Sequence, residues 1–310
     1  MAREPIPLRG KVVAITGGAR GIGRATAGAL VSRGAKVAIG DLDLELAQQT
    51  ASELGEGTVA LELDVTDRDS FARFLEQVEE RLGPLDVLVN NAGIMPLGLL
   101  VDEDDATARR LIDINLHGVL FGVKLALPGM LARDSGHILN IASQAGKAGF
   151  PGGATYCATK HAVVGLSEAL RAEVDETGVE VSCVMPAIVN TELAAGLQQA
   201  RGVKSVEPED VAAEIVSALE RPRFDVFVPR SSGAVQKVVA ILPRRAREVM
   251  AKAMNADRIL AGADFRQRAA YEERAAHSEP SLDDEAEAAQ PADEGADAGS
   301  REPVGTRSST

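Results

Sequence analysis

The stretch that decides the fold is a short apolar run that ends in a cluster of glycines. Residues 11–23 read KVVAITGGARGIG, and a helical pattern follows directly. Glycines let the chain turn sharply after a strand, and the first amides of the next helix are unpaired and carry partial positive charge. This order of strand, glycine turn and helix predicts a loop that binds the phosphates of a dinucleotide, although glycines at such a turn can also serve packing alone.

The rest of the chain repeats this alternation of apolar runs and amphipathic segments. Six further runs read as strands, and several are apolar without alternation, as is typical of strands covered on both faces (36–40, 58–63, 86–90, 137–143, 179–185 and 224–228). Helical periodicity covers 21–33, 43–54, 67–82, 104–131, 155–176 and 208–220. We therefore predict an α/β fold of the Rossmann type, with a doubly wound parallel sheet of about seven strands.

Composition excludes several classes of protein. The formal net charge is −13 over 310 residues, which argues against nucleic acid as a partner. The two cysteines and four histidines have no spacing typical of a disulfide framework or a metal site. The first residues lack the apolar core of a signal peptide, and no stretch reaches the roughly 18 to 20 consecutive apolar residues of a membrane-spanning helix. We expect a cytoplasmic protein without a metal.

The pattern changes near residue 230. The segment 234–260 is basic and amphipathic, with six lysines and arginines against two acids, and Pro243 must kink or split any helix there. Beyond Tyr271 there are no aromatic residues, and nine acids face two arginines from residue 278 onward. We predict a dinucleotide-binding and catalytic domain at 1–230, a helical extension at 231–271 and a disordered acidic tail at 272–310.

One carboxylate bears on the choice of cofactor. The second predicted strand ends at Asp41, where a carboxylate can accept hydrogen bonds from both ribose hydroxyls of NAD and would repel the 2′-phosphate of NADP. Asp41 could instead only cap the helix that begins near Asp43. Arg20, which could reach a 2′-phosphate, argues for NADP. On balance the sequence favours NAD, with NADP the less favoured cofactor.

A tyrosine and a lysine one helical turn apart supply the candidate chemistry. Tyr156 and Lys160 share one face of a predicted helix. A nearby ammonium group stabilises the phenolate and so lowers the pKa of a phenol. A shift of about two to three units corresponds to roughly 3 to 4 kcal/mol and makes the phenol a usable acid and base. Such a pair can also be an ordinary surface feature. Ser143, however, ends a strand thirteen residues earlier, at the sheet edge where ligands of open α/β sheets bind.

Together these motifs resemble the short-chain dehydrogenase/reductase family over about residues 8–230. TGGARGIG (16–23) resembles the family's cofactor loop, and NNAG (90–93) resembles the motif after its fourth strand. Residues 186–191 resemble its nicotinamide segment, except that Ala187 replaces the usual glycine. The resemblance places cofactor contacts at Gly17, Arg20, Gly21, Ile22, Gly23, Asp41, Asp64, Val65, Asn91, Ala92, Gly93, Tyr156, Lys160, Pro186, Ile188 and Thr191.

The resemblance also implies a catalytic set of Asn115, Ser143, Tyr156 and Lys160. Tyr156 would exchange a proton with the substrate oxygen, and Ser143 would hydrogen-bond that oxygen. Lys160 would lower the pKa of Tyr156 and hold the nicotinamide ribose, and Asn115 would position a water that leads protons to the solvent. The cofactor takes or gives the hydride.

The substrate and the partners are less closely specified. Residues 94–97, 144–153 and 191–206 are expected to line a mostly apolar pocket, which favours a hydrophobic secondary alcohol or ketone. An NADP-dependent 3-oxoacyl reductase and a non-catalytic nucleotide-binding scaffold are the alternatives. The segment 234–260 can lie on an anionic membrane, or pack on the domain or on a partner subunit. The resemblance implies a homodimer or homotetramer through 104–131 and 155–176.

Overall fold

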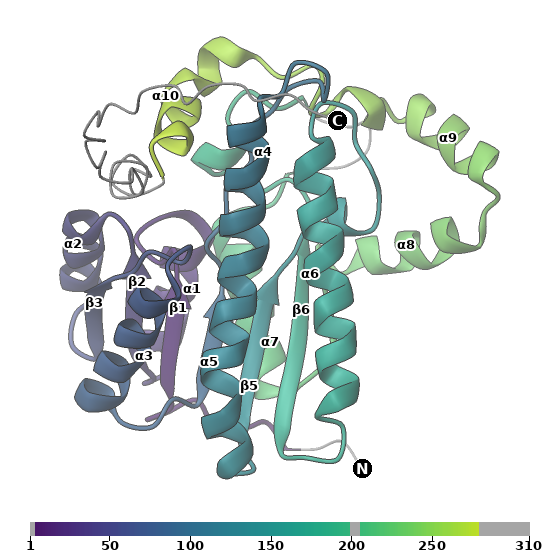
Figure 1. Ribbon diagram of the computed structural model, residues 1–310. Coiled ribbons are helices and arrows are strands. Elements are labelled where there is room, and N and C mark those ends of the chain that lie inside the picture. Colours follow the sequence, from purple (N-terminus) through teal and green to yellow (C-terminus); the bar gives the residue numbers. More distant parts are fainter. Residues whose placement is uncertain (1–3, 199–204, 279–310) are drawn as a thin grey trace, which may run out of the picture. The chain divides into compact units, whose positions relative to one another are not determined.

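Seven parallel strands form one sheet in the computed structural model, which describes residues 4–198 and 205–278 (Figure 1). Their order is β3-β2-β1-β4-β5-β6-β7, so the direction of winding reverses between β1 and β4. Ligands of such sheets bind at this reversal, beyond the carboxyl ends of the strands. The strands are β1 (Val12–Thr16), β2 (Lys36–Asp41), β3 (Thr58–Glu62), β4 (Val87–Asn90), β5 (Gly136–Ile141), β6 (Val179–Pro186) and β7 (Asp225–Val228).

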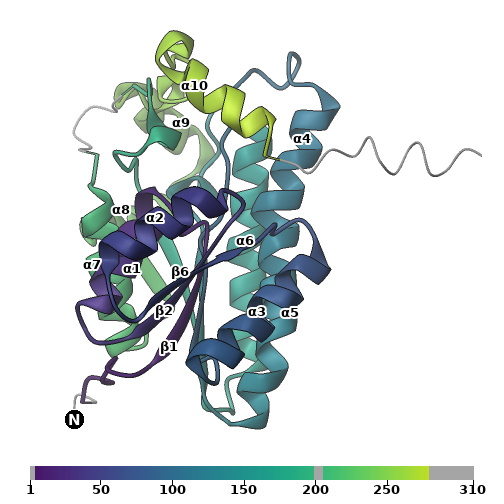
Figure 2. The ribbon, with the colours of Figure 1, turned by 90° about the vertical axis from the view of Figure 1, so that its left-hand side faces the viewer.

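Helices cover both faces of the sheet (Figure 2). One face carries α1 (Gly21–Val31) and α7 (Pro208–Glu220), and α2 (Leu44–Leu54) lies beside α1. The other face carries α3 (Arg68–Leu82), α4 (Asp105–Ile112), α5 (Gly118–Ala132) and α6 (Ala154–Glu173). The doubly wound α/β fold predicted from the sequence is thereby confirmed.

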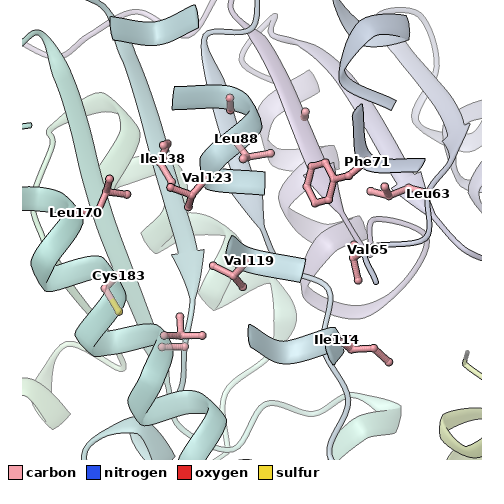
Figure 3. Packing of buried hydrophobic residues seen from close by; sticks show 14 of the residues in the cluster. Leu63, Val65, Phe71, Leu88, Ile114, Val119, Val123, Ile138, Leu170 and Cys183 are labelled. Atoms are coloured by element: carbon pink, nitrogen blue, oxygen red, sulfur yellow. The ribbon is translucent and has the colours of Figure 1, made fainter. Parts of the chain in front are cut away.

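The core consists of two apolar layers because alternate strand residues point to opposite faces. Val13 and Ile15 of β1 pack in the layer that contains Leu30 of α1. Ala14, between them, belongs to the other layer, with Phe71 of α3. Figure 3 shows part of this second layer, in which Val123 of α5 lies beside Leu88 and Ile138 of the sheet.

The helix predicted at 104–131 contains an irregular turn. Between α4 and α5 the residues Asp113–His117 form a π-helical turn, η1. The combined helix Asp105–Ala132 contains an 18-residue window with a mean hydropathy of 1.4 and, by length and composition alone, could cross a membrane, which the sequence did not predict. Its buried side chains, among them Leu111, Val119 and Met130, pack in the core of the sheet domain.

The C-terminal extension is helical and returns to the carboxyl edge of the sheet (Figure 1). Pro243 divides α8 (Ser231–Ile241) from α9 (Arg244–Ala253), as predicted. A short turn, η4 (Ala256–Arg258), leads to α10 (Phe265–Ala276). The helix α10 continues past Tyr271, because Ala275 and neighbouring side chains pack on the core, so residues 272–276 are helical and not part of a disordered tail. The rest of the predicted tail, 279–310, lies outside the described residues.

Candidate active site

One large cleft lies at the carboxyl ends of the strands and brings most of the predicted site residues together. Its volume is about 2200 Å³. Its lining combines the loop after β1, the ends of β2 to β6, and parts of α8, α9 and α10. Of the predicted residues, all but Gly23 and Asn115 line it. The reversal of winding between β1 and β4 therefore opens into a cavity large enough for a dinucleotide and a substrate together.

The glycine loop is shaped by close packing. Gly17 has φ +63°, and a Cβ there would lie 2.9 Å from the Cα of Ala92. Gly23 does not line the cleft; it lies inside α1, where a Cβ would meet the Gly17 oxygen at 2.3 Å. The N-cap residue of α1, Arg20, makes no side-chain capping hydrogen bond. The first amides of α1 therefore remain available to an anion, which fits the phosphates of a dinucleotide.

Asp41 and Arg20 have separate partners at one end of the cleft. The Asp41 carboxylate accepts hydrogen bonds from the amides of Ala19 (3.0 Å) and Asp43 (3.2 Å). Burial raises its pKa, partly offset by these bonds. Asp43, not Asp41, caps α2, and it also pairs with Arg20 at 2.7 Å. Arg20 lies 3.5 Å from Glu192 as well. The alternative in which Asp41 only caps a helix is thus wrong.

Hydrogen bonds join the end of β4 to the glycine loop and order the turn after β3. Asn91 donates from its side chain to the carbonyl oxygens of Thr16 and Gly17, both at 2.9 Å. The Thr16 hydroxyl accepts from the amides of Asn91 and Ala92. Asp64 accepts from the amide (2.8 Å) and the hydroxyl (2.7 Å) of Thr66, and lies in the cleft wall beside Val65. These bonds hold the loops around the cleft in one arrangement.

Ser143, Tyr156 and Lys160 meet in the cleft. Tyr156 and Ser143 both line it, and the Ser143 side chain is near enough to the Tyr156 hydroxyl to lower its pKa. Lys160 Nζ lies 5.8 Å from the centre of the Tyr156 ring and donates to the Ile141 carbonyl oxygen at 3.0 Å. Tyr156 and Lys160 are both buried, on the face of α6 that packs toward the sheet. The predicted shared face is therefore present.

The predicted lowering of the Tyr156 pKa is wrong for the chain by itself. Burial raises the pKa of Tyr156 to about 12, partly offset by the nearby Ser143 side chain. Burial also lowers the pKa of Lys160 to about 8. The removal of the phenol from water outweighs the ammonium group, which bonds to a backbone carbonyl instead of to the tyrosine oxygen. A lower Tyr156 pKa thus requires groups beyond those of the chain.

Asn115 lies behind the cleft, within the π-helical turn. Its side chain accepts from the Ile94 amide (2.8 Å) and donates to the Ile94 oxygen (2.9 Å) and the Thr159 hydroxyl (3.2 Å). A Cβ on Gly93 would meet the Asn115 oxygen at 3.0 Å and Lys160 Nζ at 3.5 Å. Single π-helical turns often mark functional sites. Here the turn holds Asn115 between the strand β4 loop and α6.

The segment after β6 forms the wall opposite α6. Pro186, Ile188 and Thr191 line the cleft, and the Ala187 amide donates to the Val228 oxygen at 2.8 Å. Ala187 does not have a positive φ, so the missing glycine causes no backbone strain.

The substrate end of the cleft differs in part from the prediction. Ile94 and Met95 line it, as do most residues of 144–151 and 191–197, but Pro96 and Leu97 do not. The C-terminal extension supplies wall residues that the sequence did not predict: Val235, Val239, Met250, Met254, Ile259, Leu260 and Tyr271. The available signal was the amphipathic pattern of 234–260, which contains all of these residues except Tyr271. Among the described residues, no group of three or more histidine, cysteine or acidic side chains could hold a metal ion.

Fold and site together define a dinucleotide-binding α/β oxidoreductase. Residues 11–202 match the family model of the short chain dehydrogenases. The chain is 42% identical to a sorbitol dehydrogenase of Cereibacter sphaeroides over 186 residues, 60% of this chain and 73% of the relative. It is 35% identical to carbonyl reductase family member 4 of Xenopus tropicalis, over 73% of this chain and 98% of the relative.

A solved structure agrees with these relatives. A short chain dehydrogenase/reductase from Burkholderia phymatum in complex with NAD superposes with a TM-score of 0.69 at 27% identity, over 75% of this chain and 93% of that one. The chain belongs to the short-chain dehydrogenase/reductase family. It is an NAD(P)-dependent oxidoreductase acting on CH–OH groups.

Proposed function

We propose that this protein interconverts a mainly apolar secondary alcohol and its ketone with NAD as cofactor, and that Tyr156 is the general acid and base. The observation that carries the proposal is that Tyr156, Ser143 and Lys160 line one cleft together with the glycine loop and Asp41, with Lys160 Nζ 5.8 Å from the centre of the Tyr156 ring. NAD accepts the hydride when the alcohol is oxidised, and NADH returns it when the ketone is reduced. The NAD complex of the Burkholderia phymatum relative supports this assignment.

The protein's own residues supply the proton transfer. Tyr156 releases its proton to the substrate oxygen during reduction, or takes one during oxidation. Ser143 donates a hydrogen bond to that oxygen, where negative charge develops. Lys160, positioned by the Ile141 carbonyl oxygen, holds a cationic group beside the ring. Asn115 keeps the Ile94 backbone and Thr159 in place around it.

The cofactor fits the remaining residues. The uncapped N-terminus of α1 suits the phosphates, and Asp41 suits the two ribose hydroxyls at the end of β2. Val65 and Asp64 would border the adenine, and Ile188 and Thr191 the nicotinamide. Because Arg20 is paired with Asp43 and faces Glu192, it is poorly disposed to bind a 2′-phosphate. This arrangement favours NAD over NADP, and with it an alcohol dehydrogenase over an NADP-dependent 3-oxoacyl reductase.

The substrate class follows from the wall of the cleft. Beyond Ser143 and Tyr156 the wall is formed largely by apolar side chains of three separate segments, such as Ile94, Leu193 and Leu260. An apolar wall binds aliphatic or cyclic carbon skeletons through the hydrophobic effect. Two of the relatives are named as a sorbitol dehydrogenase and, from Xanthobacter autotrophicus, a 2-(S)-hydroxypropyl-CoM dehydrogenase, so both names point to substrates that carry a hydroxyl group.

Exposed apolar side chains in two separate regions support proposals for subunit assembly and for membrane contact. The side chains of Ile112 and Leu131, on the helix that family members use between subunits, are 38% and 41% exposed, which supports a homodimer or homotetramer. Val238, Ile241 and Val249 are more than half exposed on α8 and α9 and do not line the cleft. Basic side chains flank them, which supports peripheral contact with an anionic membrane.

Replacement of Tyr156 by phenylalanine tests the proposed function. A positioned general acid contributes about 10²- to 10⁴-fold, so Tyr156→Phe should lower kcat by at least about 100-fold across a panel of ketones followed by NADH absorbance. The Kd of NADH should stay within a few-fold of the parent value. Cys157→Ala, on the adjacent buried position, is the control and should retain turnover. Turnover by Tyr156→Phe at the parent rate would mean that another group serves as the acid.

A further inference from the structure

The C-terminal segment 256–278, here called the strap, is joined to both substrate loops by one buried side chain. Arg268 is fully buried. Its guanidinium donates to the carbonyl oxygens of Leu193 (2.9 Å) and Ala195 (3.0 Å) on one loop and to that of Met95 (2.7 Å) on the other. Glu272 balances its charge at 2.7 Å. A buried, paired arginine with three backbone acceptors fixes the strap in one position over the cleft.

Glycines in the loops leave room for the strap. A Cβ on Gly152 would lie 2.7 Å from the Cα of Ala261, and one on Gly196 would lie 2.5 Å from the Asp264 oxygen. The Asp264 amide also donates to the Gly196 oxygen at 2.8 Å. The loops and the strap are therefore in backbone contact. The matched family region ends at residue 202, so the strap lies beyond it.

The strap places the chain's second tyrosine in the cleft wall. The chain has two tyrosines, and Tyr271 lines the same cleft as Tyr156. The Arg268 guanidinium lies 4.9 Å from the centre of its ring, and its hydroxyl oxygen accepts a hydrogen bond from the Met95 amide at 2.6 Å. Burial raises the pKa of Tyr271, and the nearby Tyr156 adds to the rise, so the hydroxyl keeps its proton near neutral pH.

The Tyr271 proton has no acceptor among the hydrogen bonds of the described residues. A hydroxyl donor in an apolar wall costs free energy when it is unpaired, so such a site favours a ligand that supplies the acceptor. The Arg268 contacts hold the tyrosine in place before the ligand binds, which keeps the ordering cost of that bond small.

We propose that Tyr271 is a specificity-determining residue, whose hydroxyl donates a hydrogen bond to a second oxygen of the substrate, away from the reacting one. This inference rests on the proposed function and narrows its substrate class. The substrate is then an apolar alcohol or ketone that carries another carbonyl, ester or hydroxyl oxygen. Simple dialkyl ketones contact the same apolar wall but offer no second oxygen that could accept a hydrogen bond from Tyr271.

The test uses the full chain in the Tyr156→Phe background, in which turnover of ketones is lowered at least about 100-fold and Tyr271 is the remaining tyrosine. The probes are methyl oxo-octanoates whose ester lies one, two or three methylenes from the ketone, each paired with the dialkyl ketone of equal length. Binding is measured by calorimetry with NADH present. Labelling with 3-fluorotyrosine provides one ¹⁹F signal, from Tyr271.

At least one ester should bind about five- to tenfold more tightly than its paired dialkyl ketone, and should shift the ¹⁹F signal of Tyr271. Adding Tyr271→Phe, which keeps the ring against Arg268, should reduce this preference to less than twofold and leave the affinity for the dialkyl ketone unchanged. Equal affinities in the parent background would overturn the inference. So would an equal loss for both probes on Tyr271→Phe, since that marks a purely structural role. Failure of every ketone to bind while NADH binds would instead refute the substrate class of the proposed function.

Discussion

At the scale of single residues, the charge partners of Arg20 bear on the choice of cofactor. From the sequence, Asp41 favours NAD and Arg20 favours NADP. In the structure Asp43 pairs with Arg20, while the Asp41 carboxylate is held by two backbone amides at the end of β2. The arginine's charge is already compensated, whereas the carboxylate that we propose repels a 2′-phosphate is fixed in place. Neither sequence position shows this alone, because it depends on a contact between two loops.

Replacement of Asp41 should weaken the preference for NAD. Asp41→Ser removes the carboxylate that would bind the ribose hydroxyls and repel a 2′-phosphate, so the ratio of kcat/KM with NAD to kcat/KM with NADP should fall about 10- to 100-fold. This ratio is measured by steady-state kinetics with each of the two cofactors and the same substrate. Asp67→Asn, at the N-cap of α3, is the matched control and should leave the ratio unchanged. An unchanged ratio in Asp41→Ser would remove Asp41 from cofactor selection.

At the scale of elements, the substrate end of the cleft is built by two loops and a strap that are far apart in the sequence. Gly196 combines a positive φ of +70° with backbone contact to the strap at Asp264. A side chain at this position is disfavoured twice, by the left-handed conformation and by collision with the Asp264 oxygen. The position of the loop after β6 thus depends on the strap.

A methyl group at Gly196 should therefore loosen the strap. Gly196→Ala should lower the free energy of unfolding by about 1 to 3 kcal/mol and raise KM for the ketone several-fold, with the Kd of NADH unchanged. Two controls separate the cost of the left-handed conformation from the effect of the collision with the strap. Gly10→Ala has a similar φ of +77° but an open Cβ site, so it shows the conformational cost alone. Gly165→Ala, on α6 and outside the cleft wall, has neither feature and should keep the parent KM. If Gly196→Ala leaves KM at the parent value, the contact with the strap does not shape the substrate end.

At the scale of the whole molecule, the extension has two apolar faces with different surroundings. One face of α8 and α9 lines the cleft through Val235, Val239 and Met250. The other exposes Val238, Ile241 and Val249, with Ile241 82% exposed. Lys237, Arg245 and Lys252 lie on the same two helices and outside the cleft wall. An exposed apolar face with basic side chains suits the surface of an anionic bilayer, and we propose it as a membrane contact.

Vesicle binding tests this surface. The full chain should co-sediment with vesicles rich in phosphatidylserine and much less with phosphatidylcholine vesicles, and added salt should weaken the binding. Val238→Asp with Ile241→Asp should abolish co-sedimentation and leave NADH binding intact. Val101→Asp, at an apolar side chain that is 87% exposed elsewhere on the surface, is the matched control and should bind like the parent. Equal sedimentation of parent and double variant would exclude α8 and α9 as the membrane contact.

Local sequence patterns alone determined the sheet and the catalytic end of the site. The strands and helices follow from periodicity, and the helical spacing of Tyr156 and Lys160 puts both side chains on one face wherever that helix packs. These features depend on residues near one another in the chain. The π-helical turn around Asn115 interrupts such a pattern and was not predicted.

Only the tertiary structure determined how the strap packs over the substrate end of the cleft. Arg268 and Tyr271 contact Met95 from more than 170 residues away in the sequence (separations of 173 and 176). An arginine in an amphipathic helix is usually read as a surface residue, and only the backbone carbonyls that the folded loops bring together explain its complete burial. The Tyr156 pKa has the same origin, because burial is a property of the packed structure, whereas spacing along a helix fixes only proximity.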